Sequence, residues 1–151
     1  MESPEEIVKN LTLPPVPKAG GIYHSVVIAD KYMYVSGHGP CRTDGSLITG
    51  KVGADLSLEE GKAAARQTGL TMLATIKSQI GDLNKIKRLV KTLGMVNCTL
   101  EFGDQPTVIN GFSELMVEIF GEENGKGARS AVGMILPGQI ATEVEAIFEL
   151  H

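Results

Sequence analysis

Tryptophan is absent from the sequence, and other aromatic residues are few: three tyrosines and four phenylalanines in 151 positions. Basic residues are not in excess either, because 14 Lys and Arg are outnumbered by 18 Asp and Glu, for a net charge of −4. Proteins dedicated to nucleic acids usually present a basic face and aromatic side chains that stack on bases. The composition therefore argues against a nucleic-acid partner.

Cysteines are scarce as well, and the two present, Cys41 and Cys98, lie far apart. This spacing is typical neither of a disulfide scaffold nor of a zinc site, so we expect reduced thiols and no bound metal. No apolar run approaches the roughly 20 residues that span a bilayer. The acidic start, MESPEEIVKN, lacks the apolar segment of a secretory signal. We therefore expect a cytoplasmic protein without a membrane partner.

The length and the hydrophobic fraction of 42% fit one soluble domain with its own core. At the N-terminus, Ser3 and Glu6 form a capping box that predicts a short helix. Three prolines then favour extended backbone and end it: Pro14, Pro15 and Pro17. We interpret residues 1–21 as an extension that packs on a single domain formed by residues 22–151.

Strands are indicated by apolar alternation between turn residues. Residues 25–37 should form a hairpin that turns at 29–31, and a short strand should follow near 47–52. The segment 85–100 fits a long strand, although its apolar residues also occur at helical spacing. Gly94 and the residues after it favour the strand.

Two long helices are predicted by their caps and their apolar stripes. Ser57 and Glu60 form a second capping box, and the helix that follows should end at Gly81. Asp104 should cap another helix, which should end at Gly121. Two helices can cover only one face of a sheet, so the other face should stay open.

The closing segment 128–150 reads as an antiparallel hairpin that turns at 137–139. In that register Arg129 lies opposite about Ile147 and roughly 13 Å from Glu143, at the usual rise of a strand. The two charged residues could then meet only between chains. From the residues alone, two solvated surface charges remain the alternative.

The predicted order is β-β-(β)-α-β-α-β-β, an α+β fold with two helices on one face of a mostly antiparallel sheet. The last strand divides into two faces. The helix-facing set is Val144, Ala146, Phe148 and Leu150, and the opposite set is Glu143, Glu145, Ile147 and Glu149. An open face that mixes apolar and charged residues is typical of a subunit contact.

Arg129 is the candidate for binding a carboxylate, because a guanidinium matches that group with two parallel hydrogen bonds. Glu143 could hold or deprotonate a water, and repulsion from Glu145 should raise its pKa. His38 and Cys41 are too few for a metal site, and we interpret His38 as a polar residue in a tight glycine turn. The backbone amides of Ser36 and Gly37 could approach a ligand closely.

Three stretches carry a family resemblance: YVSGHGP, DQPTVINGFSELMVEIFG and ARSAVGMILPGQIATEVEAIFEL. From Gly21 to Leu150 the chain resembles the Rid superfamily (RidA/YjgF, endoribonuclease L-PSP), and GHGP and GKVGADLSLEEG suggest a longer, less characterised subgroup. The resemblance implies a chorismate-mutase-like α/β plait, a homotrimer with a central barrel, and ligand clefts between subunits. It implies no cofactor.

By the same resemblance, Arg129 would bind the substrate carboxylate and Glu143 would position the hydrolytic water. The cleft would be lined by Tyr23, Ser36, Gly37 and Asn110. Ala131 stands where many active members have cysteine, and His38 where many have glutamine. The segment 129–137 is one residue shorter than in typical members.

Three functions follow as hypotheses. The first is cofactor-independent hydrolysis of reactive 2-imino or 2-enamino acids to 2-keto acids and ammonia. The second is a non-catalytic trimer of the same fold that binds a small carboxylate-bearing metabolite. The third, ribonuclease activity, rests on the historical family label alone, and the acidic balance of the chain weighs against it.

Overall fold

A five-stranded mixed sheet in the order β1-β2-β5-β3-β4 organises the computed structural model, which describes residues 1–151. Neighbouring strands run antiparallel except β3 and β4, which are parallel. The strands are β1 (Val26–Ala29), β2 (Tyr32–His38), β3 (Ile86–Val96), β4 (Ala128–Gly133) and β5 (Thr142–Leu150). The hairpin over 25–37 and the strand interpretation of 85–100 are thereby confirmed.

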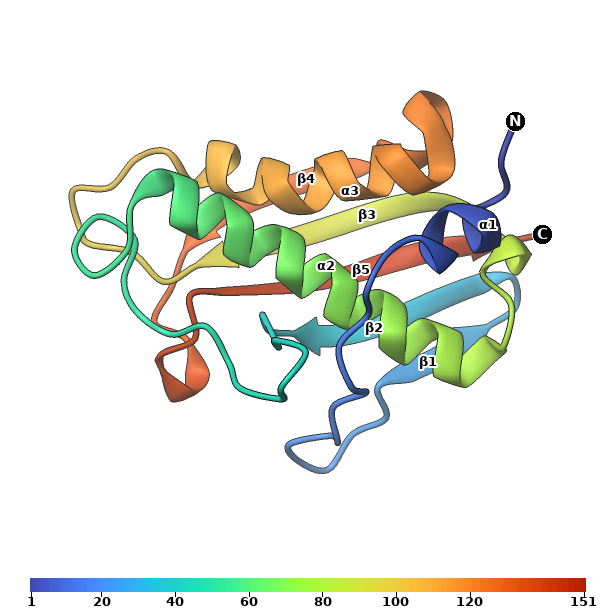
Figure 1. The fold of residues 1–151 in the computed structure, drawn as a ribbon, viewed down its shortest axis with the longest axis horizontal. Coiled ribbons are helices and arrows are strands. Elements are labelled where there is room, and N and C mark those ends of the chain that lie inside the picture. Colours follow the sequence, from blue (N-terminus) through green and yellow to red (C-terminus); the bar gives the residue numbers. More distant parts are fainter.

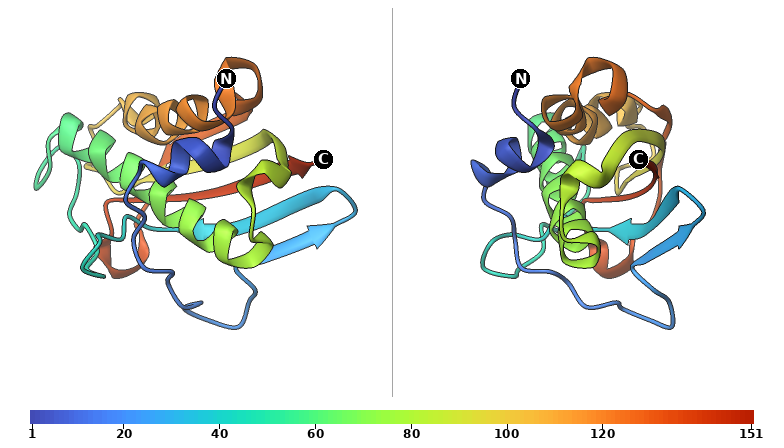
Figure 2. Two further views of the ribbon diagram at one scale, coloured as in Figure 1. Left: turned by 45° about the vertical axis from the view of Figure 1, so that its right-hand side comes forward. Right: turned by 90° about the vertical axis from the view of Figure 1, so that its right-hand side faces the viewer.

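Two long helices, α2 (Leu58–Ile80) and α3 (Gln105–Gly125), cover one face of this sheet (Figures 1 and 2). The short α1 (Pro4–Lys9) and the 3-10 turn η1 (Leu83–Lys85) lie near one end of the sheet, where both termini emerge. A second 3-10 turn, η2 (Pro137–Gln139), precedes β5. The predicted arrangement of two helices on one face is confirmed.

Both capping boxes form as the sequence predicts. The Glu60 amide donates to Ser57 Oγ over 3.1 Å, and the Ser57 amide donates to Glu60 Oε1 over 3.0 Å. Ser3 caps α1 in the same reciprocal way. Gly81 ends α2 at φ 81°, a conformation that glycine adopts without steric cost.

The helices approach each other closely because glycine occupies the contact. A Cβ at Gly111 of α3 would overlap the carbonyl oxygen of Lys62 in α2, and a Cβ at Gly69 would lie 2.7 Å from Leu115 Cδ2. Below this contact the core is continuous with the sheet. Its largest fully buried side chains include Phe112, Phe148, Met33, Met72 and Leu73.

Strand β5 divides into the two predicted faces. Val144, Ala146 and Phe148 are buried against the helices, whereas Glu145 is exposed on the other side. The open face also exposes Val27, Tyr34 and Val132, each more than one-third accessible. Large apolar side chains on this face are therefore left without cover from the chain itself.

The predicted closing hairpin is wrong. Strand β4 pairs in parallel with β3, and β5 pairs antiparallel with the opposite edge of β3, so that β3 separates them. Arg129 is in register with Thr92 and not with Ile147. The reason is that α3 connects β3 to β4 as a crossover, which returns the chain parallel to β3.

Two smaller predictions also need correction. The segment 47–52 makes only isolated bridges to other loops, because positive φ angles at Gly45, Gly50 and Gly53 interrupt extended backbone around it. Gly121 does leave the helical conformation, at φ 88° and ψ 169°, but a further helical turn follows it as far as Gly125.

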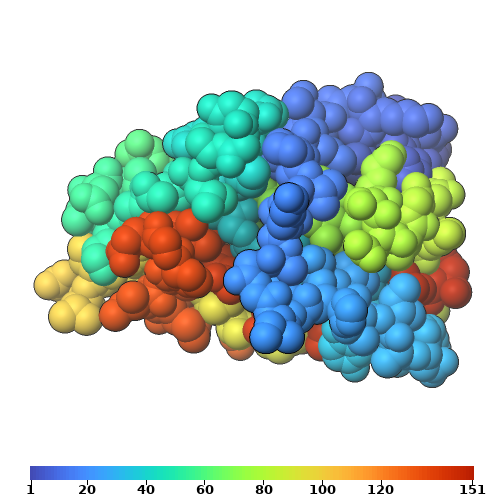
Figure 3. Space-filling view, turned by 90° about the horizontal axis from the view of Figure 1, so that it is seen from below, coloured from blue at the N-terminus to red at the C-terminus, as the bar shows by residue number.

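The N-terminal segment packs on the main fold. Val8 is 3% exposed and belongs to the core, and Glu5 accepts hydrogen bonds from the Leu83 amide and Lys77 Nζ, both over 2.7 Å. Figure 3 shows the segment on the surface, beside the C-terminal end of α2 and the β1–β2 hairpin. The division of the chain at residue 21 stays a prediction.

Candidate functional site

Arg129 forms the first of two groups of candidate residues. Its Nη1 donates to Asn110 Oδ1 over 2.8 Å and to Ser113 Oγ over 3.1 Å, and its Nη2 donates to the Pro106 carbonyl over 3.3 Å. A guanidinium has five N–H donors, so these three contacts leave two. Two free donors are what a bidentate carboxylate requires.

Local structure explains how α3 holds this arginine. Asn110 and Ser113 are three residues apart in a helix and therefore share one face. The β3–α3–β4 crossover lays that face over β4. Arg129 points to the helix side, as does Thr92, its register partner on β3. The guanidinium is thus fixed before any ligand binds.

Glu143 belongs to the second group, at the start of β5 on the open face. Its carboxylate lies against the backbone of Gly37, where a Cβ would overlap Oε2. Burial raises the pKa of Glu143, and the charge of Glu145 raises it further. The predicted direction is confirmed, although burial contributes more than the neighbouring carboxylate.

Ser36 precedes Gly37, which contacts Glu143, and the segment that contains Tyr23 folds back along the end of β2. Ser36 Oγ donates to the His24 carbonyl over 2.8 Å, and the Ser36 amide donates to the Ser25 carbonyl over 2.9 Å. The Tyr23 hydroxyl accepts a hydrogen bond from the Gly20 amide over 3.0 Å. The register with β5 shifts between Val35 and His38, so that Ser36 and Gly37 lie in an irregular stretch.

The two groups do not meet within one chain. Arg129 is in register with Thr92 and thereby with Ala146, three residues along β5 from Glu143. Two strand spacings and three residues separate their Cα atoms by roughly 14 Å. Their side chains also point to opposite faces of the sheet. One chain therefore presents two separate groups of candidate residues, which are the two candidate half-sites.

His38 is not in a glycine turn, which corrects the sequence interpretation. It ends β2, is 6% exposed, and uses both ring nitrogens: Nδ1 contacts the Ser36 carbonyl at 2.7 Å and Nε2 contacts Thr75 Oγ1 at 2.8 Å. A carbonyl only accepts, so Nδ1 carries the proton and Thr75 donates to Nε2. Burial lowers the pKa of His38, although the Ser36 hydrogen bond opposes this shift. His38 fixes the backbone beside Glu143.

Cys41 has no catalytic geometry. Its thiol is buried, and burial raises its pKa. Both nitrogens of His38 are occupied, so this histidine cannot activate the thiol. No group of three or more His, Cys, Asp or Glu side chains is close enough to hold a metal ion. No helix of the chain has the length and apolarity to cross a membrane.

Sequence reasoning missed Ser113, Thr75 and Thr92. Ser113 could have been found from its spacing of three to Asn110 in a helix. Thr75 left no such signal, because its partner His38 is distant in sequence and the pairing depends on how α2 packs on the sheet. The hydroxyl of Thr92 is buried without a hydrogen-bond partner.

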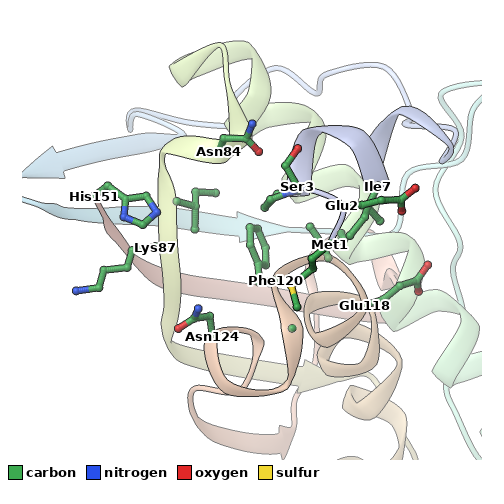
Figure 4. A pocket seen from close by; sticks show the side chains of 14 residues that line it. Met1, Glu2, Ser3, Ile7, Asn84, Lys87, Glu118, Phe120, Asn124 and His151 are labelled. Carbon is green, nitrogen blue, oxygen red and sulfur yellow. The ribbon is translucent and has the colours of Figure 1, made fainter.

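A separate cavity of about 380 Å³ lies at the other end of the sheet, where β3 begins and β5 ends. Side chains of α1, α3 and both termini surround it, including Met1, Phe120 and His151 (Figure 4). It contains none of the candidate residues. This cavity is therefore separate from both groups of candidate residues.

This five-stranded mixed sheet, with its helices on one face, defines an α+β protein of the chorismate-mutase-like type. The family model described as "YjgF/chorismate mutase-like, putative endoribonuclease" matches residues 5–140, and the chain belongs to that family. The resemblance to the Rid superfamily is thereby confirmed.

Protein TCP17 of Trypanosoma cruzi is 42% identical over 130 residues, which cover 85% of this chain and 81% of that protein. The Atu1372 protein of Agrobacterium tumefaciens, of unknown function, is 36% identical with a TM-score of 0.88, covering 98% of this chain and 92% of that one. A Shewanella oneidensis MR-1 protein described as "a putative endoribonuclease" is 31% identical with a TM-score of 0.92, covering 99% of this chain and 100% of that one.

RidA from a Psychrobacter species is 26% identical with a TM-score of 0.61, covering 89% of this chain and 94% of that one. The fold is thus more similar to less characterised members of the family than to this RidA. The prediction of a less characterised subgroup is confirmed.

Proposed function

We propose that the protein is a cofactor-independent deaminase that hydrolyses 2-imino or 2-enamino acids to 2-keto acids and ammonia. The observation that carries this proposal is the Arg129 guanidinium, which is held by Asn110 and Ser113 and keeps two N–H donors free. Membership of the family that includes RidA supports it. The arginine would bind the substrate carboxylate and fix the position of the imine carbon beside it.

Glu143 would activate the water. Its raised pKa favours a carboxylate that accepts a proton as water attacks the imine carbon. The water oxygen forms a bond to that carbon as the carbon–nitrogen π bond breaks, and the nitrogen takes up protons, one of which Glu143 returns. The carbon–nitrogen bond of the resulting carbinolamine then breaks, which releases ammonia and leaves the keto acid. Tyr23 and the Ser36–Gly37 backbone would line the same cleft.

The two half-sites would combine between subunits of a homotrimer. Two observations support this arrangement: Arg129 and Glu143 face opposite sides of one sheet, and the open face exposes Val27, Tyr34 and Val132. An apolar sheet face of this kind is typical of a subunit interface. In the trimer, Arg129 of one subunit would face Glu143 of its neighbour.

The test is release of keto acid and ammonia from 2-aminoacrylate generated in the assay by a separate enzyme. We expect the wild type to accelerate release, and Arg129→Ala and Glu143→Gln to lose that acceleration. Equal rates for the wild type and Arg129→Ala would refute the deaminase. Light scattering should give three times the chain mass of 16.1 kDa. A monomer would refute the shared cleft.

A second candidate is a trimer that binds a small carboxylate without turnover. Ala131 favours it, because this residue shares the helix side of β4 with Arg129 and brings no reactive group. Here a small carboxylate should raise the melting temperature of the wild type but not of Arg129→Ala. Measurable turnover in the assay above would exclude this candidate.

A further inference from the structure

A cavity of about 230 Å³ opens between α3 and the β3–β4 edge, on the helix-covered side of the sheet. Its volume corresponds to roughly seven or eight water molecules at about 30 Å³ each, so it suits a small group and not a large cofactor. It shares Arg129 and Asn110 with the proposed site. The other lining residues are Leu89, Thr92, Ser113, Gly125, Lys126 and Gly127.

None of the residues that line this cavity is acidic, although the chain as a whole has a net charge of −4. Four other surface cavities each include glutamate: Glu118 in one, Glu101 in another, Glu114 in a third and Glu149 in a fourth. The cavity beside Arg129 instead has two cationic residues. Its charge therefore favours an anionic group.

The polar side chains of the wall have donors to spare. Ser113 Oγ and Asn110 Oδ1 accept from Arg129, and neither the serine hydroxyl proton nor the asparagine NH₂ group has an acceptor within the chain. Thr92 is 1% exposed, and its hydroxyl has no partner at all. Buried hydroxyl groups are normally hydrogen-bonded, so the Thr92 hydroxyl is free to donate to an acceptor that enters the cavity.

Lys126 stands at the rim of the cavity and is exposed. It pairs with Glu122 one helical turn earlier, and an exposed pair of this kind is weak. The ammonium group can therefore turn to an anion in the cavity at little cost. The glycines on either side of Lys126 approach backbone atoms of α3 and β3, which leaves no room for larger residues there.

We propose that this cavity receives a second acidic group of the substrate, a carboxylate on the side chain of the imino acid. The inference rests on the proposed function, because it assigns the first carboxylate to the two free donors of Arg129. Thr92, Ser113 and Asn110 would donate to the second carboxylate, and Lys126 would neutralise it. The preferred substrates are then imino acids of the dicarboxylic class.

The test compares two keto acids that differ in the distal carboxylate, 2-oxoglutarate and 2-oxobutyrate, by titration calorimetry. The wild type should bind the diacid at least about tenfold more tightly, the effect of one charge-assisted hydrogen bond. In Thr92→Val and in Lys126→Gln the ratio of the two affinities should fall towards one. Ser130→Ala, on the open face of β4, is the matched control and should keep the wild-type ratio.

The possible results distinguish failure of this inference from failure of the proposed function. If the wild type binds both acids equally and Arg129→Ala binds neither, the second carboxylate site is refuted, whereas the first carboxylate site at Arg129 is retained. A preference that persists in both Thr92→Val and Lys126→Gln also refutes the second carboxylate site. Failure of the wild type to bind either acid overturns the proposed second carboxylate site, and the release assay with 2-aminoacrylate then tests the proposed function separately. Because Lys126 is exposed, Lys126→Gln keeps the test decisive even if Thr92→Val folds poorly.

Discussion

The backbone of Gly37 lies against the carboxylate of Glu143, and no space remains between them for a side chain. Gly37 has no positive φ, so the contact, and not backbone freedom, requires glycine at this position. Gly37, which has no side chain, therefore sets the position of the Glu143 carboxylate, the proposed water-activating group.

Gly37→Ala should displace the Glu143 side chain and lower deaminase activity, with little loss of stability because the displaced group is the end of a flexible side chain. Gly103→Ala is the control, since nothing lies within 4 Å of a Cβ there. Activity assays and thermal melts of both variants check this prediction. Wild-type activity in Gly37→Ala would contradict it.

Glu143→Gln should stabilise the protein at neutral pH. Because the pKa of Glu143 is raised mainly by burial, the folded protein holds a proton there at pH values where the unfolded chain has lost it. In that window, above the ordinary glutamate value of 4.5, the free energy of unfolding falls as pH rises. The ionised Glu143 side chain therefore destabilises the folded protein at neutral pH.

Thermal melts across pH check this sign. The advantage of Glu143→Gln over the wild type should be present at neutral pH and vanish below 4.5, where both side chains are neutral. Glu145→Gln removes the second cause of the shift, so the acid limb of the activity profile should move to lower pH. A neutral-pH melting temperature that falls in Glu143→Gln would argue against the burial of this carboxylate.

His38 should make the folded state sensitive to mild acid. Burial lowers the pKa of His38. Below the ordinary value of 6.5, the histidine is therefore protonated in the unfolded chain while it stays neutral in the folded protein. Stability is then lost as pH falls from 6.5 towards the lowered pKa. Denaturation of His38→Gln should show a flatter dependence on pH across this window.

Nitrogen NMR provides a direct check on the same histidine. The Ser36 carbonyl can only accept, so the proton should be on Nδ1 in the neutral ring. Thr75→Val removes the donor to Nε2 and should cost about 1–3 kcal/mol, the usual effect of an unpaired buried group. A proton found on Nε2 would contradict the hydrogen bond to Ser36.

Gly111→Ala should destabilise the protein and weaken the Arg129 half-site together. The new Cβ would overlap the Lys62 carbonyl and lie 3.1 Å from the Arg66 amide nitrogen, and these backbone atoms cannot rotate away. Overpacking of this kind costs about 1–3 kcal/mol. As α3 moves outward, Asn110 should leave Arg129, which denaturation and carboxylate titration would detect. Gly103→Ala again serves as the control.

Features that depend on a few adjacent residues could be predicted from the sequence. Ser57 and Glu60 meet within one helical turn, so their reciprocal hydrogen bonds need no information from the rest of the chain. The division of β5 into two faces follows from simple alternation, and it held from Val144 to Phe148.

Strand pairing could not be predicted in the same way. The turn residues at 137–139 suggest a reversal, but they do not reveal that β3 is inserted between the strands on either side. In β3 itself, register shifts on both sides of Leu89 place this residue in the main core, whereas Leu93 packs with Met95 on the other face. A spacing of four predicts the same face, and only the bulges break that rule.

Because β4 pairs in parallel with β3, the residues of the two candidate half-sites differ in how far apart they lie in the sequence. Every residue that holds Arg129 comes from the continuous stretch 92–129, whereas Glu143 depends on β2 and on the loop before β1, more than 100 positions earlier in the sequence. Local contacts form early in folding and distant ones late. The residues proposed to bind the acid should therefore come together earlier in folding than those that position the proposed water-activating carboxylate.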